Sequence, residues 1–468
     1  MRGANNIFAL AFGLFLGLAF WKFGNPVILD HKIIPPASPS ELWADAWPTH
    51  WANWIFLPVA LVGTLVAFRS KLCWPARHWL WLLPLLWFCW QLISASQTVD
   101  ADLTAATLWQ FFGCVACYFI GAIVLNREAA VRWMLVGVLA AFAFCLVRAV
   151  DQRLVEFPQS HQMLAEGARD GWTNVPPEML VEMKREQVVI TTNGVDVANP
   201  VVLAKFAKGR VMGTLVYPNA LAGAVLLLLP LALTLAFGTK KLRPAIRLIV
   251  IALTCLLGGA GFFWTGSKLG WLIAMTMGGL CLLRLNWPTR LKLTMLAIVA
   301  ILGLGIFAAR FHNYFAAGAT SAGARLDYWR AAVQTTETHP VFGTGPGTFQ
   351  KPYAKIRNDL AIQSPQTELP EMARLTHNDY LEQFSDSGIP GGIFYGAWIV
   401  LALATVGRRV WKTGNQIIFA IFIGLLGWFV QGVGEFSLYI PALAWAAFTL
   451  LGCSLAQRNA EHRLGAGQ

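Results

Sequence analysis

Long apolar runs recur along the whole chain and constrain its fold more than any other feature of the sequence. A helix needs about 20 predominantly apolar residues to cross the hydrocarbon core of a bilayer. Runs of about this length predict an all-α polytopic membrane protein with about 12 transmembrane helices. The predicted spans are 6–28, 52–68, 79–95, 105–125, 131–150, 219–237, 245–264, 268–284, 291–309, 388–407, 415–432 and 438–456.

The composition excludes the other broad classes of protein. Hydrophobic residues make up 56% of the chain and charged residues only 13%, which is about half the charged share of a soluble domain. A soluble chain of 468 residues would lack the polar surface that it needs. The eight cysteines lie in or beside the apolar runs, which argues against a disulfide framework.

Lysine and arginine gather in every second short loop and so predict the orientation of the chain. Such loops include 69–77, 284–292 and 408–412, whereas an alternate loop such as 96–104 is neutral or acidic. Because positive loops stay in the cytoplasm, both termini are expected to be cytoplasmic. The first run lacks a small-x-small cleavage site and is interpreted as an uncleaved span. The net charge of +12 is then largely a topology signal, and nucleic-acid binding is not expected.

Two large loops fall on the outer side in this topology. Together with the spans they are expected to form a single membrane domain. A shorter outer loop, 29–51, carries tryptophans that indicate an interfacial segment. In the first large loop, Glu178–Ile190 is expected to form a short amphipathic helix. The chain shows no internal repeat, which favours an enzyme at the outer face over a transporter built of two halves. The expected parts are spans one to five (1–150), an outer loop (151–218), spans six to nine (219–309), an outer loop (310–387), and spans ten to twelve with a tail (388–468).

The second large loop contains an amphipathic segment followed by a glycine-rich turn. Residues 321–338 are expected to form a helix on which Arg325 lies one turn before Trp329, so the two side chains can stack or share a face. The sequence Val-Phe-Gly-Thr-Gly-Pro-Gly follows, with Gly345 as the middle one of its three glycines. Such a turn either brings backbone close to a ligand or reverses the chain.

A polar segment, Leu-Thr-His-Asn-Asp-Tyr-Leu-Glu, follows at 375–382. Thr376 and Asp379 have capping-box spacing, so a helix is expected to begin at Thr376 with His377 in its first turn. The positive end of a helix disfavours a charged imidazole, and a neutral imidazole suits a general base. The same helix end would offer N–H groups to an anion. The alternative is that His377 is an ordinary cap or a solvated loop residue.

Two further cations lie at the outer edge of the membrane, against the charge bias of the loops. Arg210 comes just before the sixth span, and Lys268 lies between spans seven and eight. Each could simply extend to lipid headgroups. Together with Arg325 they could instead form an anion site, since a planar guanidinium suits a diphosphate. The histidines lack the spacing typical of a metal site, so neither a metal nor a cofactor is expected.

The order of these motifs resembles the O-antigen ligase family, which is related to the Wzy-type polymerases. The Ser267-Lys268 pair also fits the pattern of the family, and the resemblance covers roughly 205–400 together with the layout of spans. The matching pieces are Arg-Leu-Asp-Tyr-Trp (325–329), His-Pro-Val-Phe-Gly-Thr-Gly-Pro-Gly (339–347), Thr-His-Asn-Asp-Tyr-Leu-Glu (376–382), Gly388, and the stretch from Arg210 to Asn219.

The resemblance implies an activity and a set of partners. Members of the family transfer a glycan from undecaprenyl diphosphate to an acceptor hydroxyl on the periplasmic side of the bacterial inner membrane, without a metal. The implied partners are the undecaprenyl-diphosphate-linked glycan, a glycan or lipid acceptor, and the lipid bilayer. A Wzy-type polymerase or a protein O-oligosaccharyltransferase is an alternative within the class, and a small-anion transporter is one from a different class. By position, the resemblance assigns catalysis to His377, Arg325 and Arg210, and substrate binding to Lys268, Trp329, Asn378 and Gly345.

Overall fold

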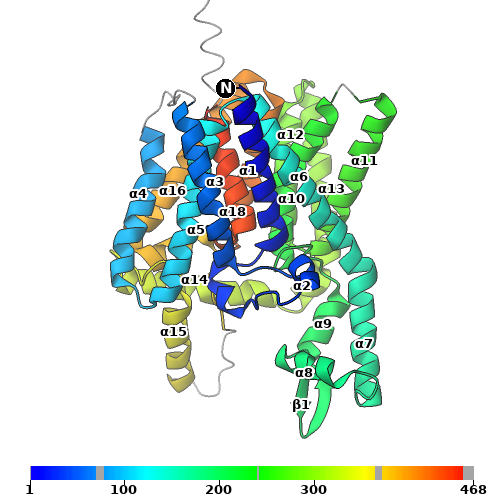
Figure 1. Cartoon of the computed structure of the whole chain (residues 1–468). Helices are drawn as coiled ribbons and strands as arrows, with labels where there is room; N and C mark the ends of the chain where they lie inside the picture. The colour runs from blue at the N-terminus through cyan, green and yellow to red at the C-terminus, as the bar shows by residue number, and fades with distance from the viewer. Residues whose placement is uncertain (1, 70–78, 240–241, 364–371, 457–468) are drawn as a thin grey trace, which may run out of the picture.

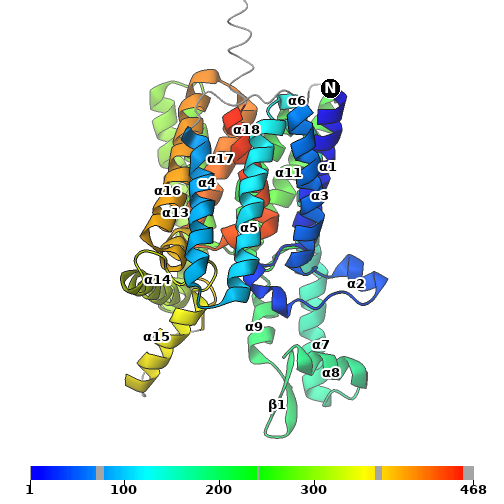
Figure 2. The same cartoon turned by 60° about the vertical axis from the view of Figure 1, so that its left-hand side comes forward.

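The structure, a computed structural model, describes residues 2–69, 79–239, 242–363 and 372–456. Most of the helices in this part of the chain run side by side in a bundle (Figures 1 and 2). Eight helical segments are long and apolar enough to cross a membrane, judged by length and composition. The prediction of an all-α polytopic membrane protein is therefore confirmed, and the number of twelve crossings stays a prediction.

Each of the twelve predicted spans coincides with a helix. Four of these helices have only 16 or 17 residues, slightly fewer than the about 20 that a crossing needs. The helices are α1 (Arg2–Lys22), α3 (Thr49–Arg69), α4 (Trp79–Ser94), α5 (Ala101–Phe119), α6 (Glu128–Asp151), α10 (Pro218–Gly238), α11 (Pro244–Thr265), α12 (Lys268–Arg284), α13 (Thr289–Ala316), α16 (Asp379–Thr413), α17 (Gln416–Gln431) and α18 (Pro441–Ala456).

Helix α18, the last in the described part of the chain, lies in the core of the bundle and is buried almost throughout. It packs against α1, α5 and α17. The Trp445 ring lies 5.6 Å from that of Phe15 and 5.2 Å from that of Phe56. In contrast, the apolar window of α13 contains no buried residue, as expected of a helix that faces lipid. The core therefore joins the two ends of the described chain.

Helices α1 and α6 approach each other closely because glycines meet where they cross. A Cβ atom on Gly13 would lie 2.1 Å from the carbonyl oxygen of Met134, and one on Gly137 would lie 2.3 Å from the carbonyl carbon of Gly13. Small residues allow helix backbones to pack at this distance in a membrane protein. The contact brings α1 and α6 together along the bundle.

The first large outer loop forms a projection at the end of the bundle opposite the N-terminus (Figure 1). Helix α6 does not stop at 150 as predicted, because a π-helical turn over 152–156 carries it into α7 without a break. The predicted helix over Glu178–Ile190 is correct only in its first half. The helix ends at Arg185, a turn over 186–188 follows, and a strand begins at Val189; the Asn193-Gly194 turn has the positive φ angles that join it to the next strand. The elements are α7 (Phe157–Asp170), α8 (Pro177–Arg185), β1 (Val189–Thr192), β2 (Val195–Ala198) and α9 (Pro200–Lys208).

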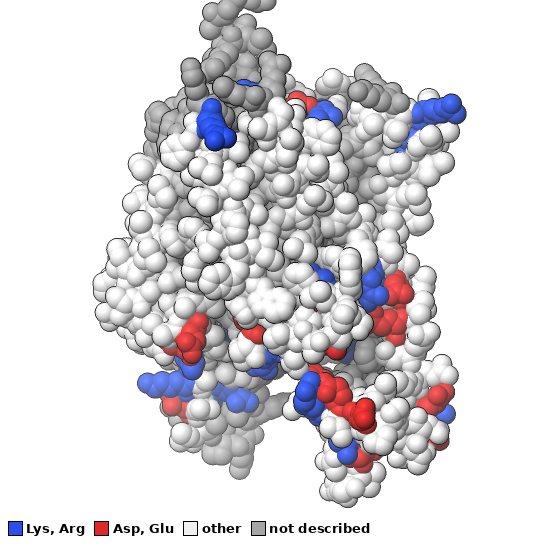
Figure 3. All heavy atoms as spheres, in the orientation of Figure 1, with Lys and Arg blue, Asp and Glu red and all other residues white. Residues whose placement is uncertain are grey.

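The second large outer loop lies at the same end of the bundle (Figures 1 and 2). Its helix α14 (Thr320–Thr338) matches the predicted helix over 321–338, and α15 (Gln350–Gln363) follows. A short helix, α2 (Pro39–Ala44), also lies at this end. On the face seen in Figure 3, charged side chains gather towards the two ends and leave an uncharged band between them. This pattern is typical of a surface that faces a bilayer.

Candidate active site

A buried carboxylate, Glu435, lies at the centre of the candidate site. It belongs to the turn between α17 and α18 and is only 1% exposed. Nη2 of Arg325, from α14, lies 2.5 Å from its Oε1. The Tyr217 hydroxyl donates to Oε2 at 3.1 Å, and the Asn219 amide donates to Oε1 at 2.6 Å. Because a buried charge needs such partners, the carboxylate draws α14 and the start of α10 together.

Arg210 joins this group through Asn219. Its Nη2 donates to Oδ1 of Asn219 at 2.9 Å, and its Nε donates to the carbonyl oxygen of Thr265, at the end of α11, at 2.6 Å. The side-chain amide of Asn219 therefore bridges Arg210 and Glu435. Arg210 and Arg325, which are far apart in the sequence, thus belong to one hydrogen-bonded network.

The charges of the network act on one another. Burial alone would raise the pKa of Glu435, but the facing His377 and the positive charge of Arg325 outweigh it and hold this pKa below its usual value. Burial lowers the pKa of Arg210; Glu435 opposes this change and Arg325 adds to it. The Glu435 carboxylate is therefore ionised at neutral pH, and arginine side chains in general stay charged in proteins. Two cations around one anion leave this network with a positive charge.

His377 faces the same carboxylate. Its Nδ1 lies 3.7 Å from Oε2 of Glu435, which is beyond hydrogen-bonding distance, and this nitrogen is buried without a partner in the described part of the chain. The ring centroid lies 4.7 Å from that of Phe436 and 6.0 Å from that of Tyr328. The side chain is 29% exposed, so part of the imidazole stays accessible.

The predicted start of the helix at Thr376 is wrong. Asn378 is the cap of α16, and its Oδ1 accepts from the N–H groups of residues 380 and 381. Thr376 pairs instead with Glu382, whose Oε2 accepts from both its N–H and its hydroxyl at 3.0 Å. His377 therefore precedes the helix, in a left-handed conformation with φ 53°. The N–H groups that were expected to bind an anion are occupied by the protein.

Hydrogen bonds of Asp379 join the turn that carries His377 to the turn that carries Glu435. The Asp379 N–H donates to the carbonyl oxygens of Gly432 at 2.7 Å and Glu435 at 3.1 Å. In return, the Asp379 carboxylate accepts from the N–H of Leu438. Because the strained backbone of His377 is tied down in this way, the imidazole keeps a defined position beside the carboxylate.

Lys268 begins α12 next to the same turn. Its Nζ lies 3.7 Å from the ring centroid of Tyr314, and Arg210 and Arg325 act on it electrostatically. A Cβ atom on Gly434 would lie 2.5 Å from Cδ2 of Leu269, which shows how closely the start of α12 approaches Glu435. Among the described residues, no carboxylate forms a salt bridge with Lys268. Its charge therefore adds to the positive field of the network.

Two other predicted substrate-binding residues serve local structure. Asn378 caps α16, as described above. Trp329 packs beside a buried cluster that includes Tyr328, Phe349 and Tyr353. Arg325, one turn away, pairs with Glu435 instead of stacking on the Trp329 ring. The indole N–H of Trp329 is buried without a hydrogen-bond partner in the described part of the chain.

The glycine-rich turn approaches the protein itself. The Gly345 N–H donates to the carbonyl oxygen of Asp386 at 2.8 Å, and a Cβ atom on Gly345 would lie 2.3 Å from Oγ1 of Thr98. Beneath the turn, Gly388 breaks the helical backbone of α16 with φ 70° and ψ −178°, and a Cβ atom there would lie 2.1 Å from the carbonyl oxygen of Val341. The observed contacts therefore fit the interpretation in which the turn reverses the chain.

Glu435 was missed by the sequence analysis, although the sequence holds a signal for it. It is the only acidic residue between positions 388 and 456. An isolated ionisable residue between two apolar runs is costly, and it is often functional for that reason. The local motifs could not reveal its partners, since Arg325 precedes it by 110 residues.

The geometry can now be compared with known proteins. No group of three or more His, Cys, Asp or Glu residues that could hold a metal ion occurs in the described part of the chain. No curated protein matches the chain. Residues 253–396 match the family model Wzy_C, described as O-antigen ligase, and this range includes Lys268, Arg325 and His377. The match confirms, over residues 253–396, the resemblance to the O-antigen ligase family predicted from the motifs.

Proposed function

We propose that the protein transfers a glycan from undecaprenyl diphosphate to a hydroxyl group of a glycan or lipid acceptor. The match to the O-antigen ligase family supports glycan transfer in general. The observation that carries the finer proposal is the network in which Arg210, Arg325 and His377 surround one buried carboxylate. Cations beside a histidine suit a leaving diphosphate and an incoming hydroxyl, which supports the proposal.

The arginines and Lys268 neutralise the leaving group. As the bond between the anomeric carbon and the diphosphate oxygen breaks, the electron pair stays on the diphosphate. Guanidinium groups held in advance stabilise this charge where it develops, because they need no reorganisation during the reaction. Arg325 is 23% exposed at the side chain, so it keeps donors for a ligand in addition to its bond with Glu435.

His377 takes the proton of the acceptor. With a proton on Nδ1, which faces Glu435, its Nε2 has a free electron pair. The acceptor oxygen attacks the anomeric carbon while its proton moves to Nε2, so that one C–O bond forms as another breaks. The negative charge of Glu435, 3.7 Å from Nδ1, stabilises the resulting imidazolium electrostatically.

The site is assigned to the periplasmic face of the bacterial inner membrane. Both large loops lie at the end of the bundle that holds the network, and the basic short loops predict that the opposite end is cytoplasmic. In this orientation both termini are cytoplasmic, and the donor reaches the network from the outer leaflet.

A reconstituted reaction tests the proposal. The purified full chain is incubated with a lipid-linked glycan donor and an acceptor, and the products are separated by mass. Transfer of the whole glycan to the acceptor supports ligation, whereas lengthened lipid-linked glycan indicates a polymerase. If no glycan leaves the diphosphate under any condition that preserves the fold, the proposal is wrong.

A conservative variant tests the role of Arg325. Arg325→Lys is expected to lose turnover and weaken donor binding, because lysine offers a point charge in place of the planar fork. The matched control is Arg330→Lys on the same helix, where the side chain is 77% exposed and pairs with Asp327. Equal activity of the two variants would contradict the assignment.

A further inference from the structure

A cavity of about 830 Å³ lies beside the segment that carries Arg210. Gly213, Thr214 and Leu215 form one wall of it, and the other walls come from the ends of α1 and α6 and from the segment around α2. Gly213 is the third residue after Arg210, so at most about 11 Å of chain lies between them. The volume falls within the range of small-molecule sites.

Three aromatic rings form one side of this cavity. The Trp21 ring lies 4.9 Å from that of Trp43 and 5.6 Å from that of Phe144, measured between centroids. Trp43 is 66% exposed and Phe144 is 42% exposed, so their faces are open to a ligand. We call this space, lined by Trp21, Trp43 and Phe144, the aromatic cavity.

The aromatic wall is held in place by Lys22. Its Nζ donates to the carbonyl oxygens of Trp43 at 2.6 Å and Asp45 at 2.9 Å, and it lies 4.5 Å from the ring centroid of Trp21. These bonds tie the C-terminal end of α2 to the end of α1. Because the anchor uses backbone carbonyl groups, the Trp43 side chain is available for other contacts.

The remaining lining of the aromatic cavity is polar without being an anion site. Arg148 pairs with Asp151 and with Glu156, whose Oε2 lies 3.0 Å from Nη2. Asp45 also lines the cavity. The guanidinium charge is thus compensated, in contrast to the positive network around Glu435, and a phosphate would be repelled here rather than bound.

The segment between the aromatic cavity and Arg210 is fixed by Gln152. Its Oε1 accepts from the N–H groups of Met212 at 3.1 Å and Gly213 at 2.8 Å, and its Nε2 donates to the Gly213 carbonyl oxygen at 3.0 Å. Thr214 donates to the carbonyl oxygen of Phe20 at 2.7 Å. A ligand in the aromatic cavity would therefore lie at a defined position relative to Arg210.

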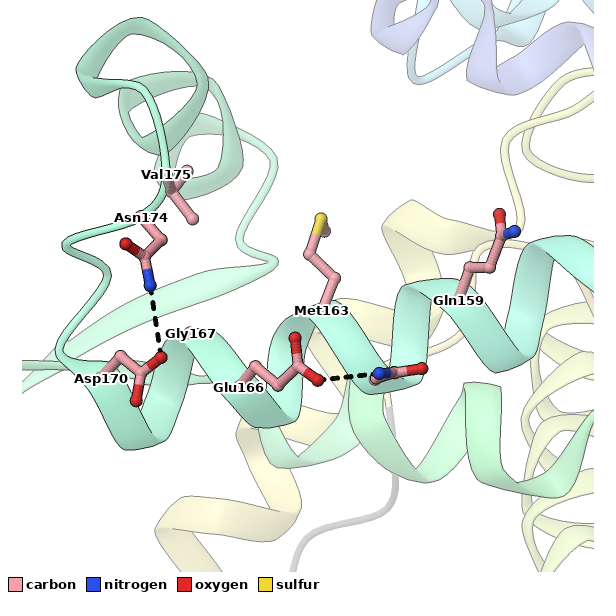
Figure 4. A pocket seen from close by; sticks show the side chains of 8 residues that line it. Gln159, Met163, Glu166, Gly167, Asp170, Asn174 and Val175 are labelled. Carbon is pink, nitrogen blue, oxygen red and sulfur yellow. Dashed lines mark hydrogen bonds between the residues drawn. The ribbon is translucent and has the colours of Figure 1, made fainter.

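A second hollow, of about 310 Å³, lies farther out along α7 (Figure 4). Amide and carboxylate side chains line it, and Gln162 and Glu166 bond to each other at 2.8 Å. None of its lining residues is aromatic. The aromatic cavity is the better candidate because it combines open ring faces with polar groups beside the network.

We propose that the aromatic cavity binds a neutral sugar segment of the donor glycan or of the acceptor. An indole face packs against the C–H groups of a pyranose ring, while carboxylate and hydroxyl groups such as those of Asp45 and Ser40 bond to its hydroxyls. This inference rests on the proposed glycan transfer, which supplies both sugar chains. The diphosphate binds the positive network, and the sugars extend into the neutral cavity.

Kinetics with two variants test the inference and separate the two sources of sugar. Trp43→Ala and Phe144→Ala are each expected to raise the KM of one glycan substrate about 10-fold while kcat stays unchanged, as for a loss of uniform binding. A raised donor KM assigns the cavity to the donor glycan, and a raised acceptor KM assigns it to the acceptor. Trp54→Ala, a 71% exposed tryptophan outside the cavity, is the control. Unchanged KM values for both substrates would overturn the inference.

A binding measurement keeps this test independent of transfer. Glycan released from the donor or the acceptor by mild acid is mixed with the purified full chain in detergent, and saturation-transfer NMR detects sugar protons that contact the protein. The signal is expected to persist in Trp54→Ala and to be lost in Trp43→Ala. Sugar binding without turnover would refute the proposed function alone, whereas turnover with KM and NMR signals unaffected by either variant would refute this inference alone. A bound phospholipid that Phe144→Ala releases, with the sugar signal unchanged, would show a lipid site instead and overturn it.

Discussion

Glu435→Gln is the most informative single change, because it removes one charge and preserves the shape of the side chain. In the native site this carboxylate is 1% exposed and accepts from Arg325, Asn219 and Tyr217. Breaking a buried ion pair by removing one partner costs about 3–5 kcal/mol. The amide also presents N–H groups to at least one of the three donors, so its hydrogen bonds cannot all be kept.

This loss of folding free energy can be measured as a shift in melting temperature. For 468 residues, the specific entropy of unfolding of globular proteins gives about 1 kcal/mol per kelvin. The Glu435→Gln protein should therefore melt at least about 3–5 °C lower in detergent, and it should lose turnover because Arg325 and His377 lose their common partner. Glu128→Gln provides a matched control, since Glu128 forms a surface pair with Arg132 that is worth at most about 1 kcal/mol.

A double-mutant cycle isolates the interaction itself. If Glu435 and Arg325 act as a pair, Glu435→Gln combined with Arg325→Gln should cost less than the sum of the two single changes. Strictly additive melting shifts, or a Glu435→Gln protein with native melting temperature and native turnover, would refute the central role of the carboxylate.

Four further outcomes follow from the structure. His377→Ala should lose about 10²–10⁴-fold in turnover but bind donor normally; an active variant at matched expression would remove the base assignment. Gly388→Ala should destabilise the protein by at least about 1–3 kcal/mol because of its backbone conformation, whereas Gly396→Ala on the same helix, with open space around it, should melt normally. Single cysteines at Ser160 and Ser321, in a cysteine-free background, should react with an impermeant reagent added from outside; protection of both would reverse the orientation. Turnover should persist in excess EDTA, and its loss with rescue by one metal would contradict the metal-free mechanism.

The sequence predicted elements defined by local patterns. Every predicted span coincides with a helix, because about 20 apolar residues carry their own signal, and the amphipathic period predicted the helix of 321–338 to within one residue at its start. The predictions failed where hydrogen bonds to residues a few positions farther along the chain override the local pattern. Thr376 pairs with Glu382 rather than with the capping-box position, and the last two residues of Glu178–Ile190 belong to a strand that pairs with Val195–Ala198.

The candidate site likewise contains residues that local motifs predicted and one residue that they could not predict. The motifs identified Arg210, Arg325 and His377, and the structure places all three in or beside one network. They could not identify Glu435, because its contacts cross 110 and 216 residues of chain. An isolated charged residue between apolar runs can be recognised in the sequence, because its burial costs free energy. The residues that pair with it become evident only in the folded structure.

The position of Glu435 in the sequence also determines when the network can form during protein synthesis. A ribosome makes both arginines of the network long before it makes the carboxylate that joins them, since Glu435 follows Arg325 by 110 residues. Helix α18, which fills the core between α1, α5 and α17, is made later still. In a partly synthesised chain the two arginines therefore lack their common carboxylate, and the network can be complete only after Glu435 has been made.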